Sequence, residues 1–290
     1  MEDYPAILGC DVAGEVVEVH SSLADVFDIG DRVTGAATCL DRKDGRYCYA
    51  GFQEFVVLRL PCIAKIPKKV AYEDAVVLPL GINTAASCLF MDETLGLKAP
   101  SVDGIKVGRG GILLVWGASS SVGSCGVQMA THAGYEVVGV ASRRNHDMVQ
   151  ALGATMCFDQ SDPDVVGDIV TYLSGKEVVG AYDAVSNDAT LNTVCEILDN
   201  SRGWKLVASV MPGAEGKATR GVKIVTNFAT DMASSEFFKA TWQWLDKVME
   251  ENRIKYMPPS EVIGNGLEHL QQAADLLAEG VSAKKLVVSV

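Results

Sequence analysis

A run of small and hydroxyl-bearing residues, Gly117-Ala-Ser-Ser-Ser-Val-Gly123, follows the apolar run ILLVW and opens a helical pattern. A glycine at each end permits a tight turn and a close approach of helix to strand, and the N–H groups of a helix N-terminus bind phosphate oxygens. The middle glycine of the usual G-x-G-x-x-G is replaced, and Ser119, Ser120 and Ser121 offer hydroxyl donors instead. The run predicts a pyrophosphate-binding turn, with an ordinary strand–turn–helix as the alternative.

The next apolar strand, EVVGVA, ends in Ser142-Arg143-Arg144-Asn145 and carries no Asp or Glu there. Sites for NAD usually place an acidic residue at this point, where it binds the ribose 2′-hydroxyl. A hydroxyl and guanidinium groups suit a 2′-phosphate, because Arg binds phosphate in a forked geometry. The strand end therefore predicts NADPH, with a solvated pair of surface charges as the alternative.

Strand and helix patterns alternate around this turn from Gly111 onwards. Strands are expected at ILLVW, EVVGVAS, TMCF, AYDAVS, KLVASV and VKIVTN, and helices over 122–134, 145–152, 162–174 and 189–199. Strands that alternate with helices of this length predict an α/β fold with a doubly wound parallel sheet, covered on both faces.

The flanking regions have a different character. Short strands are expected at CDVAGEVVEV, DRVTGAA, QEFVVL and CIAKIP, followed by helical segments up to residue 91 that break near Pro79. Two more helices, 234–252 and 267–279, precede a last strand in KKLVVSV. We expect three parts: 1–91, a nucleotide-binding domain over 92–252, and a tail over 253–290 that returns to the first part.

Composition excludes several classes of protein. The formal net charge of −12 argues against binding to nucleic acid or to an anionic membrane surface. No apolar stretch is long enough to span a membrane, and no basic segment followed by an apolar run marks a signal peptide. Eight cysteines occur singly and none forms a C-x-x-C pair, which suggests reduced thiols and a cytoplasmic location.

The chain resembles the medium-chain dehydrogenase/reductase superfamily and, more narrowly, the fungal trans-acting enoyl reductases and TOXD-like proteins. The matching segments cover nearly the whole chain in order: ILGCDVAGEVVEV, FDIGDRVTG, GFQEFVVL, AVVLPLGINTAASCLF, WGASSSVG, ASRRNHDMVQALGA and GLEHLQQAADLLAEGVSAKKLVVSV. The resemblance implies a Rossmann sheet with a GroES-like β domain. It also implies a further N-terminal segment, so we expect a truncated, partial GroES-like domain with an open sheet edge.

The resemblance also implies roles for individual residues. Phosphate contacts fall on Ser119, Ser120, Ser121 and Val122, between Gly117 and Gly123. The 2′-phosphate and adenosine contacts fall on Ser142, Arg143, Arg144 and Asn145, with Gln160 where the branch commonly has a Tyr. The nicotinamide would be lined by Val207, Ala208, Val287 and Val288. A substrate channel would be lined by Thr84, Ala85, Ala86, Ser87, Cys88, Leu89, Phe90 and Met91, with Phe228 nearby. Plain core packing is the alternative for the apolar members.

No zinc site is expected. Zinc needs three or four convergent ligands, but the G-H-E motif of the zinc alcohol dehydrogenases is replaced by Gly9-Cys10-Asp11, and their four-cysteine lobe is missing. The absence of a Lewis acid favours reduction of an activated C=C bond, with hydride passing to the β-carbon of an enone or enoyl thioester. No catalytic residue can be assigned; Tyr47, Tyr49 and water are the candidate proton donors.

Three functions remain open. The first is an NADPH-dependent enoyl reductase for a carrier-tethered acyl substrate, acting in trans with a polyketide synthase. The second is a quinone or enone reductase for small molecules on the same fold. The third is a non-catalytic NADPH-binding protein, because a fold by itself does not fix an activity. In each case we expect a monomer or homodimer without nucleic acid or membrane partners.

Overall fold

The computed structural model describes residues 6–38, 47–104, 108–226 and 235–290. The chain divides into two compact units. Residues 84–229 form one continuous unit, which we call the α/β unit, and residues 1–83 and 230–290 together form the other, which we call the split unit. The boundaries expected at 91 and 252 do not coincide with this division.

The α/β unit is built on a parallel sheet of six strands, as expected. In sequence order they are β4 (Ile112–Trp116), β5 (Glu136–Ala141), β6 (Met156–Asp159), β7 (Val178–Asp183), β8 (Leu206–Ser209) and β9 (Lys223–Thr226). Their order in the sheet is β6-β5-β4-β7-β8-β9. The chain therefore adds β5 and β6 on one side of β4, and then β7, β8 and β9 on the other side. Open α/β sheets bind ligands at this switch point, outside the carboxyl ends of the strands.

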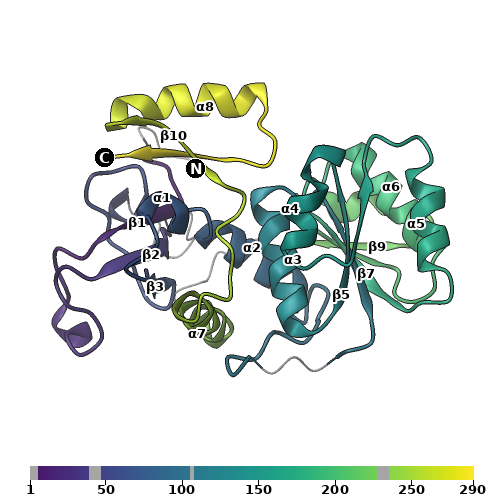
Figure 1. Ribbon diagram of the computed structural model, residues 1–290, viewed down its shortest axis with the longest axis horizontal. Helices are drawn as coiled ribbons and strands as arrows, with labels where there is room; N and C mark the ends of the chain where they lie inside the picture. The colour runs from purple at the N-terminus through teal and green to yellow at the C-terminus, as the bar shows by residue number, and fades with distance from the viewer. Residues whose placement is uncertain (1–5, 39–46, 105–107, 227–234) are drawn as a thin grey trace. The chain divides into compact units, whose positions relative to one another are not determined.

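Helices cover both faces of this sheet, with α3 (Ser121–Ala133) and α4 (His146–Ala151) on one face and α5 (Val165–Leu173) and α6 (Asp188–Asp199) on the other (Figure 1). Alternate residues of β4 point to opposite faces. Ile112, Leu114 and Trp116 therefore join the core cluster that buries α5 and α6. All residues of β4 are buried, as a strand covered on both faces requires.

The split unit contains a three-stranded antiparallel sheet of β1 (Asp11–Glu15), β2 (Arg32–Ala36) and β3 (Ile63–Lys65). It also contains a parallel pair, β10 (Ser260–Asn265) and β11 (Lys285–Ser289). Its helices are α1 (Tyr72–Ala75), α7 (Glu236–Glu250) and α8 (Leu270–Glu279), together with the first part of α2 (Pro79–Phe90). Strand β10 was not expected from the sequence, whereas the helix break near Pro79 is confirmed by the start of α2 at that residue.

The expected strand QEFVVL is wrong, because residues 53–58 form bends and loop. Gln53 donates from Nε2 to the carbonyl oxygens of Tyr47 and Ala50, over 2.7 and 2.9 Å. The Val57 amide donates to the Cys48 carbonyl over 3.0 Å. These bonds fold the segment back on the short 3-10 turn at Tyr47–Tyr49.

Helix α7 belongs to the split unit, although the sequence grouped it with the nucleotide-binding domain. The Trp242 indole donates to Asn83 Oδ1 over 2.8 Å, and Asp246 accepts the amide of Lys65, on β3, over 2.8 Å. The tail is joined to the same unit by the Lys285 ammonium, which lies 2.6 Å from Asp11 Oδ2. The buried Trp242 side chain and the bond from the Lys65 amide to Asp246 thus fix α7 within the split unit.

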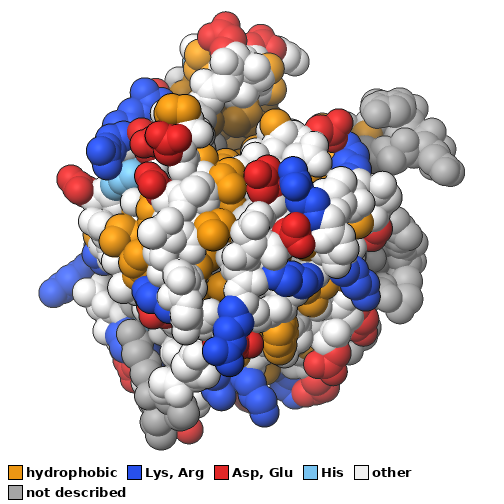
Figure 2. All heavy atoms as spheres, turned by 90° about the vertical axis from the view of Figure 1, so that its right-hand side faces the viewer, with side chains coloured by type: hydrophobic (Ala, Val, Ile, Leu, Met, Phe, Trp, Pro, Cys, Tyr) orange, Lys and Arg blue, Asp and Glu red, His pale blue; other side chains and the backbone are white. Residues whose placement is uncertain are grey.

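Two surface properties complete the description. No helix in the described ranges combines the length and apolarity that crossing a membrane requires. On the face drawn in Figure 2, Lys and Arg side chains lie among Asp and Glu side chains, with scattered apolar groups between them.

Candidate nucleotide-binding site

The turn after β4 has the backbone that the glycine spacing predicts. Gly117 has a φ angle of +72°, which L side chains rarely adopt. A Cβ atom on Gly117 would lie 2.6 Å from Val185 Cγ2, and a Cβ atom on Gly123 would lie 2.2 Å from the Gly117 carbonyl oxygen. Both positions therefore require glycine, one for conformation and one for the close approach of α3 to the turn.

The three serines of the turn have different roles. Ser120 is the N-cap of α3, and its Oγ accepts from the Gly123 amide over 3.0 Å. The Oγ of Ser119 accepts from Asn145 Nδ2 over 3.2 Å. Ser121 and Val122 lie in the first turn of α3. A helix of this length offers its first N–H groups and the positive end of its dipole to an anion.

The ends of β5 and β6 lie beside this turn. Ser142 follows β5, and its Oγ accepts from Gln160 Nε2 over 3.3 Å. Arg143 and Arg144 are exposed on the 3-10 turn Arg143–Asn145, while Asn145 is buried. Side-chain hydrogen bonds therefore pair Ser119 with Asn145 and Ser142 with Gln160, and the Asn145 amide joins the two pairs by donating to the Ser142 carbonyl over 2.8 Å.

A carboxylate lies one strand away from the end of β5. Asp159 ends β6, and hydrogen bonds from the Ser161 amide and hydroxyl lower the pKa of its carboxyl group, with smaller contributions from the charges of His146 and Arg143. Asp159 is thus ionised and turned toward Ser161. The end of β5 itself carries hydroxyl and guanidinium groups.

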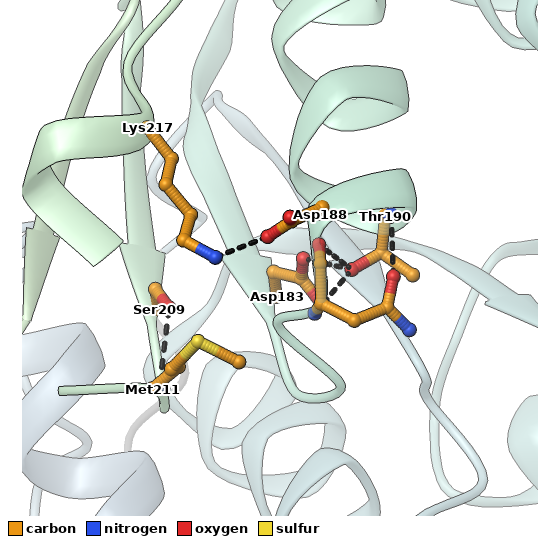
Figure 3. A network of polar contacts seen from close by, with 7 residues as sticks. Asp183, Asp188, Thr190, Ser209, Met211 and Lys217 are labelled. Carbon is orange, nitrogen blue, oxygen red and sulfur yellow. Dashed lines mark hydrogen bonds and ion pairs between the residues drawn. The ribbon is translucent and has the colours of Figure 1, made fainter. Parts of the chain in front are cut away.

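A buried carboxylate, which sequence reasoning missed, organises the loop after β7. Asp183 is fully buried and accepts from the amides of Val185 and Ser186, over 3.0 and 2.8 Å. Its carboxylate also accepts from the Thr190 hydroxyl over 2.7 Å (Figure 3). Burial raises the pKa of Asp183, and these donors partly offset that rise. The sequence feature that could have indicated Asp183 is its position at the carboxyl end of β7, the strand that lies next to β4 at the switch point.

Ser186 links this loop to the next strand. It has a φ angle of +59°, which is uncommon for a residue other than glycine. Its hydroxyl donates to the Asp183 carbonyl over 2.6 Å and accepts from the Val210 amide over 3.1 Å. Nearby, the Ser209 hydroxyl accepts from the Met211 amide, and Lys217 forms an ion pair with Asp188 (Figure 3). The carboxyl ends of β7 and β8 are thus tied into one network.

The predicted nicotinamide contacts lie in two units. Val207 and Ala208 are fully buried in β8, and Val207 belongs to the core cluster. Val287 and Val288 lie in β11 of the split unit and are half-buried. Their contact with a cofactor stays a prediction.

The predicted substrate channel runs along the second part of α2. Ala85, Ala86 and Leu89 are fully buried, as are Ser87 and Cys88. The Cys88 thiol lies 3.9 Å from the Ser209 carbonyl oxygen, and burial raises its pKa to about 12. These residues pack in the α/β unit, and their role toward substrate stays a prediction. Phe228 lies outside the described residues.

The position of the zinc-ligand motif is taken up by an ion pair. Asp11 accepts from the Leu80 amide on one oxygen and from the Lys285 ammonium on the other, each over 2.6 Å. A cation at Asp11 would have to displace Lys285. Within the described ranges, no three His, Cys, Asp or Glu side chains converge in a way that could hold a metal ion. The residues described at this position therefore do not fit zinc.

The candidate proton donors differ in exposure. Tyr47 is 40% exposed, whereas Tyr49 is buried with the Arg59 guanidinium 4.0 Å from its ring centre. Tyr47 is thus the more accessible hydroxyl of the two.

Comparison with known proteins decides the family. The alcohol dehydrogenase GroES-like domain matches residues 1–68, and the zinc-binding dehydrogenase family matches residues 121–245. The chain is 38% identical to the zinc-binding alcohol dehydrogenase domain-containing protein cipB of Emericella nidulans, over 99% of this chain and 81% of that protein. It belongs to the medium-chain dehydrogenase/reductase superfamily. As a member of this superfamily, it is an oxidoreductase with a Rossmann sheet and a GroES-like domain.

Other proteins match the chain over nearly its whole length at lower identity. The trans-enoyl reductase himH of Aspergillus japonicus is 32% identical over 99% of this chain and 82% of that protein. Among solved structures, a quinone oxidoreductase from Coxiella burnetii has a TM-score of 0.68 at 24% identity, over 99% of this chain and 80% of that one. The CurK enoyl reductase has a TM-score of 0.72 at 16% identity, over 98% and 79%. These structural likenesses confirm the fold.

Proposed function

We propose that this oxidoreductase uses NADPH to reduce an activated C=C bond, in an enoyl thioester or an enone, as a trans-acting enoyl reductase. The observation that carries the cofactor choice is the end of β5, where Ser142, Arg143 and Arg144 stand without a carboxylate. The relatives named trans-enoyl reductase, such as himH, support the reaction. A cytoplasmic location and a carrier-tethered acyl substrate, supplied by a polyketide synthase, belong to the same proposal.

The residues present fit a dinucleotide phosphate at the carboxyl ends of the strands. The first turn of α3 and the hydroxyls of Ser119 and Ser121 would hold the pyrophosphate. The N-cap bond of Ser120 fixes the start of α3 at this turn. Arg143 and Arg144 would hold the 2′-phosphate through charge-assisted hydrogen bonds. The loop after β7, held by Asp183, would border the cofactor beside Gly117.

NADPH, when bound, supplies the hydride for the reduction. The chain must then stabilise negative charge on the carbonyl oxygen of the substrate and deliver a proton to the neighbouring carbon. Tyr47, which is exposed, Tyr49 and a water molecule are the candidate donors. The buried thiol of Cys88 is a poor acid because its pKa is raised to about 12.

An assay with three substrate classes tests this proposal. Purified protein and NADPH are mixed with an enoyl thioester, a cyclic enone or a quinone, and loss of NADPH absorbance is followed. We expect turnover of the thioester, with kcat/KM at least about tenfold above that for the quinone, equal to about 1.4 kcal/mol of transition-state binding. Turnover of the quinone alone would support the second candidate, a quinone reductase, which the likeness to the Coxiella burnetii fold favours.

The third candidate, a non-catalytic NADPH-binding protein, is separated by titration. Binding of NADPH without turnover of any of the three substrates would support it. No binding of NADPH at all would contradict all three candidates. Sedimentation at several protein concentrations decides between the monomer and the homodimer that we expect.

A further inference from the structure

The α/β unit has a hollow at the end of the sheet opposite the candidate nucleotide site. It has a volume of about 390 Å³ and is lined by Gly96, Leu97, Lys98, Gly108, Arg109, Tyr135, Val179 and Trp204. Tyr135 directly precedes β5, and Val179 lies at the start of β7. The strands are parallel, so these residues lie at the amino ends, whereas Gly117 and Ser142 follow carboxyl ends. The hollow is therefore distinct from the nucleotide site.

Trp204 is an exposed aromatic ring on a fixed backbone. Its side chain is 46% exposed, although its amide donates to the Val178 carbonyl over 2.8 Å. Gly203 before it has a φ angle of +117°, and a Cβ atom there would lie 2.1 Å from the Val178 carbonyl oxygen. The close approach of glycine to β7 thus holds the tryptophan in place while its ring stays open to solvent. Exposed tryptophans on rigid backbone are typical of binding surfaces.

Two cationic side chains line the same hollow. Neither Lys98 nor Arg109 forms an ion pair with any described residue. Among the described residues, the Arg109 side chain bonds only the Ala133 carbonyl, to which its Nε donates over 3.0 Å. Other cations of the same unit do have carboxylate partners, as Lys176 has in Glu136 and Arg202 in Glu177. Two cations without carboxylate partners at one hollow attract an anion there.

Tyr135 adds a directed donor. Its ring is nine-tenths buried, and its hydroxyl oxygen accepts from the Lys98 amide over 2.9 Å. That bond leaves the hydroxyl hydrogen to donate, and no described residue accepts it. A buried hydroxyl usually donates its hydrogen as well as accepting one.

We propose that this hollow binds a small organic acid, a carboxylate attached to a flat unsaturated or aromatic framework. Lys98, Arg109 and the Tyr135 hydroxyl would hold the carboxylate, and the flat group would stack on Trp204 over Leu97 and Val179. The volume lies within the range of about 300–1,000 Å³ that is usual for small-molecule sites. This inference does not depend on the substrate or the cofactor proposed above.

Calorimetric titration of the whole chain with 2-naphthoate tests the proposal, with 2-naphthamide and cyclohexanecarboxylate as matched probes. The amide lacks the charge and the saturated acid lacks the flat ring. We expect each to bind at least about tenfold more weakly than 2-naphthoate, a loss of about 1.4 kcal/mol. Equal binding of the amide, or no binding of 2-naphthoate, would overturn the proposal.

Variants locate the site. K98M and R109Q are each expected to weaken 2-naphthoate binding at least about fivefold, while W204F retains binding and W204L loses it. K217Q is the control, because it removes an exposed positive charge from the turn Ala214–Lys217, which follows the carboxyl end of β8 in the same unit. Circular dichroism confirms that each variant is folded.

The last experiment measures 2-naphthoate binding in the presence of NADPH. Saturation with NADPH is expected to leave the affinity for 2-naphthoate within about twofold, since the two sites lie at opposite ends of the strands. Competition between NADPH and 2-naphthoate would place the acid in the nucleotide site and contradict the inference. An unchanged affinity in both K98M and R109Q would contradict it as well.

Discussion

The carbonyl oxygen of Gly117 lies 2.2 Å from the point that a Cβ atom of residue 123 would occupy. The substitution Gly123→Ala must therefore push α3 away from the phosphate turn. We expect a loss of about 1–3 kcal/mol in the free energy of unfolding, as for other overpacked sites. We also expect at least about tenfold weaker NADPH binding, or about 1.4 kcal/mol. Urea denaturation and a fluorescence titration measure the two effects.

Gly167→Ala is the matched control. Gly167 lies in α5 of the same unit, and a Cβ atom there would meet nothing within 4 Å. We expect an unchanged affinity for NADPH and a gain of about 0.5–1 kcal/mol, because alanine favours a helix over glycine. A loss of NADPH binding in Gly167→Ala, or normal binding in Gly123→Ala, would contradict the role given to the turn.

Arg143 and Arg144 are predicted to select the phosphorylated cofactor. Replacing both with alanine should weaken NADPH binding by about ten- to a hundredfold, since hydrogen bonds to a charged group contribute about 1.5–3 kcal/mol. Binding of NADH should change by less than about twofold, because it lacks the 2′-phosphate. Arg202→Ala removes an exposed arginine elsewhere in the unit and is the control. An equal fall in the affinities for NADPH and NADH would contradict the role of Arg143 and Arg144 in binding the 2′-phosphate.

The Asp183 carboxyl group accepts three hydrogen bonds and has no cationic partner among the residues that the structure describes. Asp183→Ala leaves these donors buried and unsatisfied, so we expect a loss of about 2–4 kcal/mol in the free energy of unfolding. Asp183→Asn keeps an acceptor for the two amides, and the Thr190 hydroxyl can rotate, so its loss should be smaller. Urea denaturation of both variants checks the order.

The pKa of Asp183 also gives a pH dependence. Burial raises its pKa in the folded chain above the ordinary value of 3.8, so the folded state holds the proton more tightly than the unfolded state. The resulting stabilisation is present below the unfolded pKa and is lost as pH rises through the folded pKa. The stability of the wild type relative to Asp183→Asn should therefore fall over that interval. A relative stability that rises with pH would show that the hydrogen bonds outweigh burial.

The Asp11–Lys285 pair is expected to stabilise the split unit. Their side chains are only 14% and 20% exposed, so water screens the pair weakly. In a double-mutant cycle with Asp11→Asn and Lys285→Met, we expect a coupling energy of about 1–3 kcal/mol. The exposed pair Lys284–Glu261, beside it in sequence, is the control and should give less than about 1 kcal/mol. Equal coupling in the two pairs would contradict the role of burial.

Thiol reactivity should follow burial. Burial raises the pKa of Cys62, Cys88 and Cys157 to about 12, whereas Cys48 is exposed. Because the thiolate is the reactive form, iodoacetamide at pH 8 should label Cys48 well before the other three. Peptide mass spectrometry after short exposure measures the order. Early labelling of Cys88 would show that the end of α2 opens readily.

The sequence predicted the α/β unit well because its signals are local. The apolar run ILLVW became β4, since a strand covered on both faces needs continuous apolar residues, and the shorter run VKIVTN became β9 at the edge of the sheet. The strand expected at QEFVVL failed because the segment folds back on the Tyr47–Tyr49 turn, where the Gln53 side chain donates to two carbonyl oxygens. A side-chain bond of this kind leaves no periodic trace.

The same limit applies to the candidate site. Serines 119–121 and Arg143–Arg144 could be found because they follow apolar strands directly, at the ends where ligands bind. Asp183 was missed because AYDAVS shows only that a strand ends there. Its importance depends on donors from Ser186 and Thr190, and burial of a carboxylate with three donors is visible only in three dimensions. The assignment of α7 failed for a similar reason, since Trp242 finds its partner 159 positions away.

The discontinuity of the split unit has a consequence for biosynthesis. Residues 84–229 are continuous, so the α/β unit can fold as soon as the ribosome has released them. Strand β1, by contrast, is made before the α/β unit but must wait for Lys285, which emerges 274 residues after Asp11. Until then the nascent chain carries strands β1–β3 without α7 and β11. During this interval the apolar surface of these strands stays uncovered, and binding by a chaperone would prevent its aggregation.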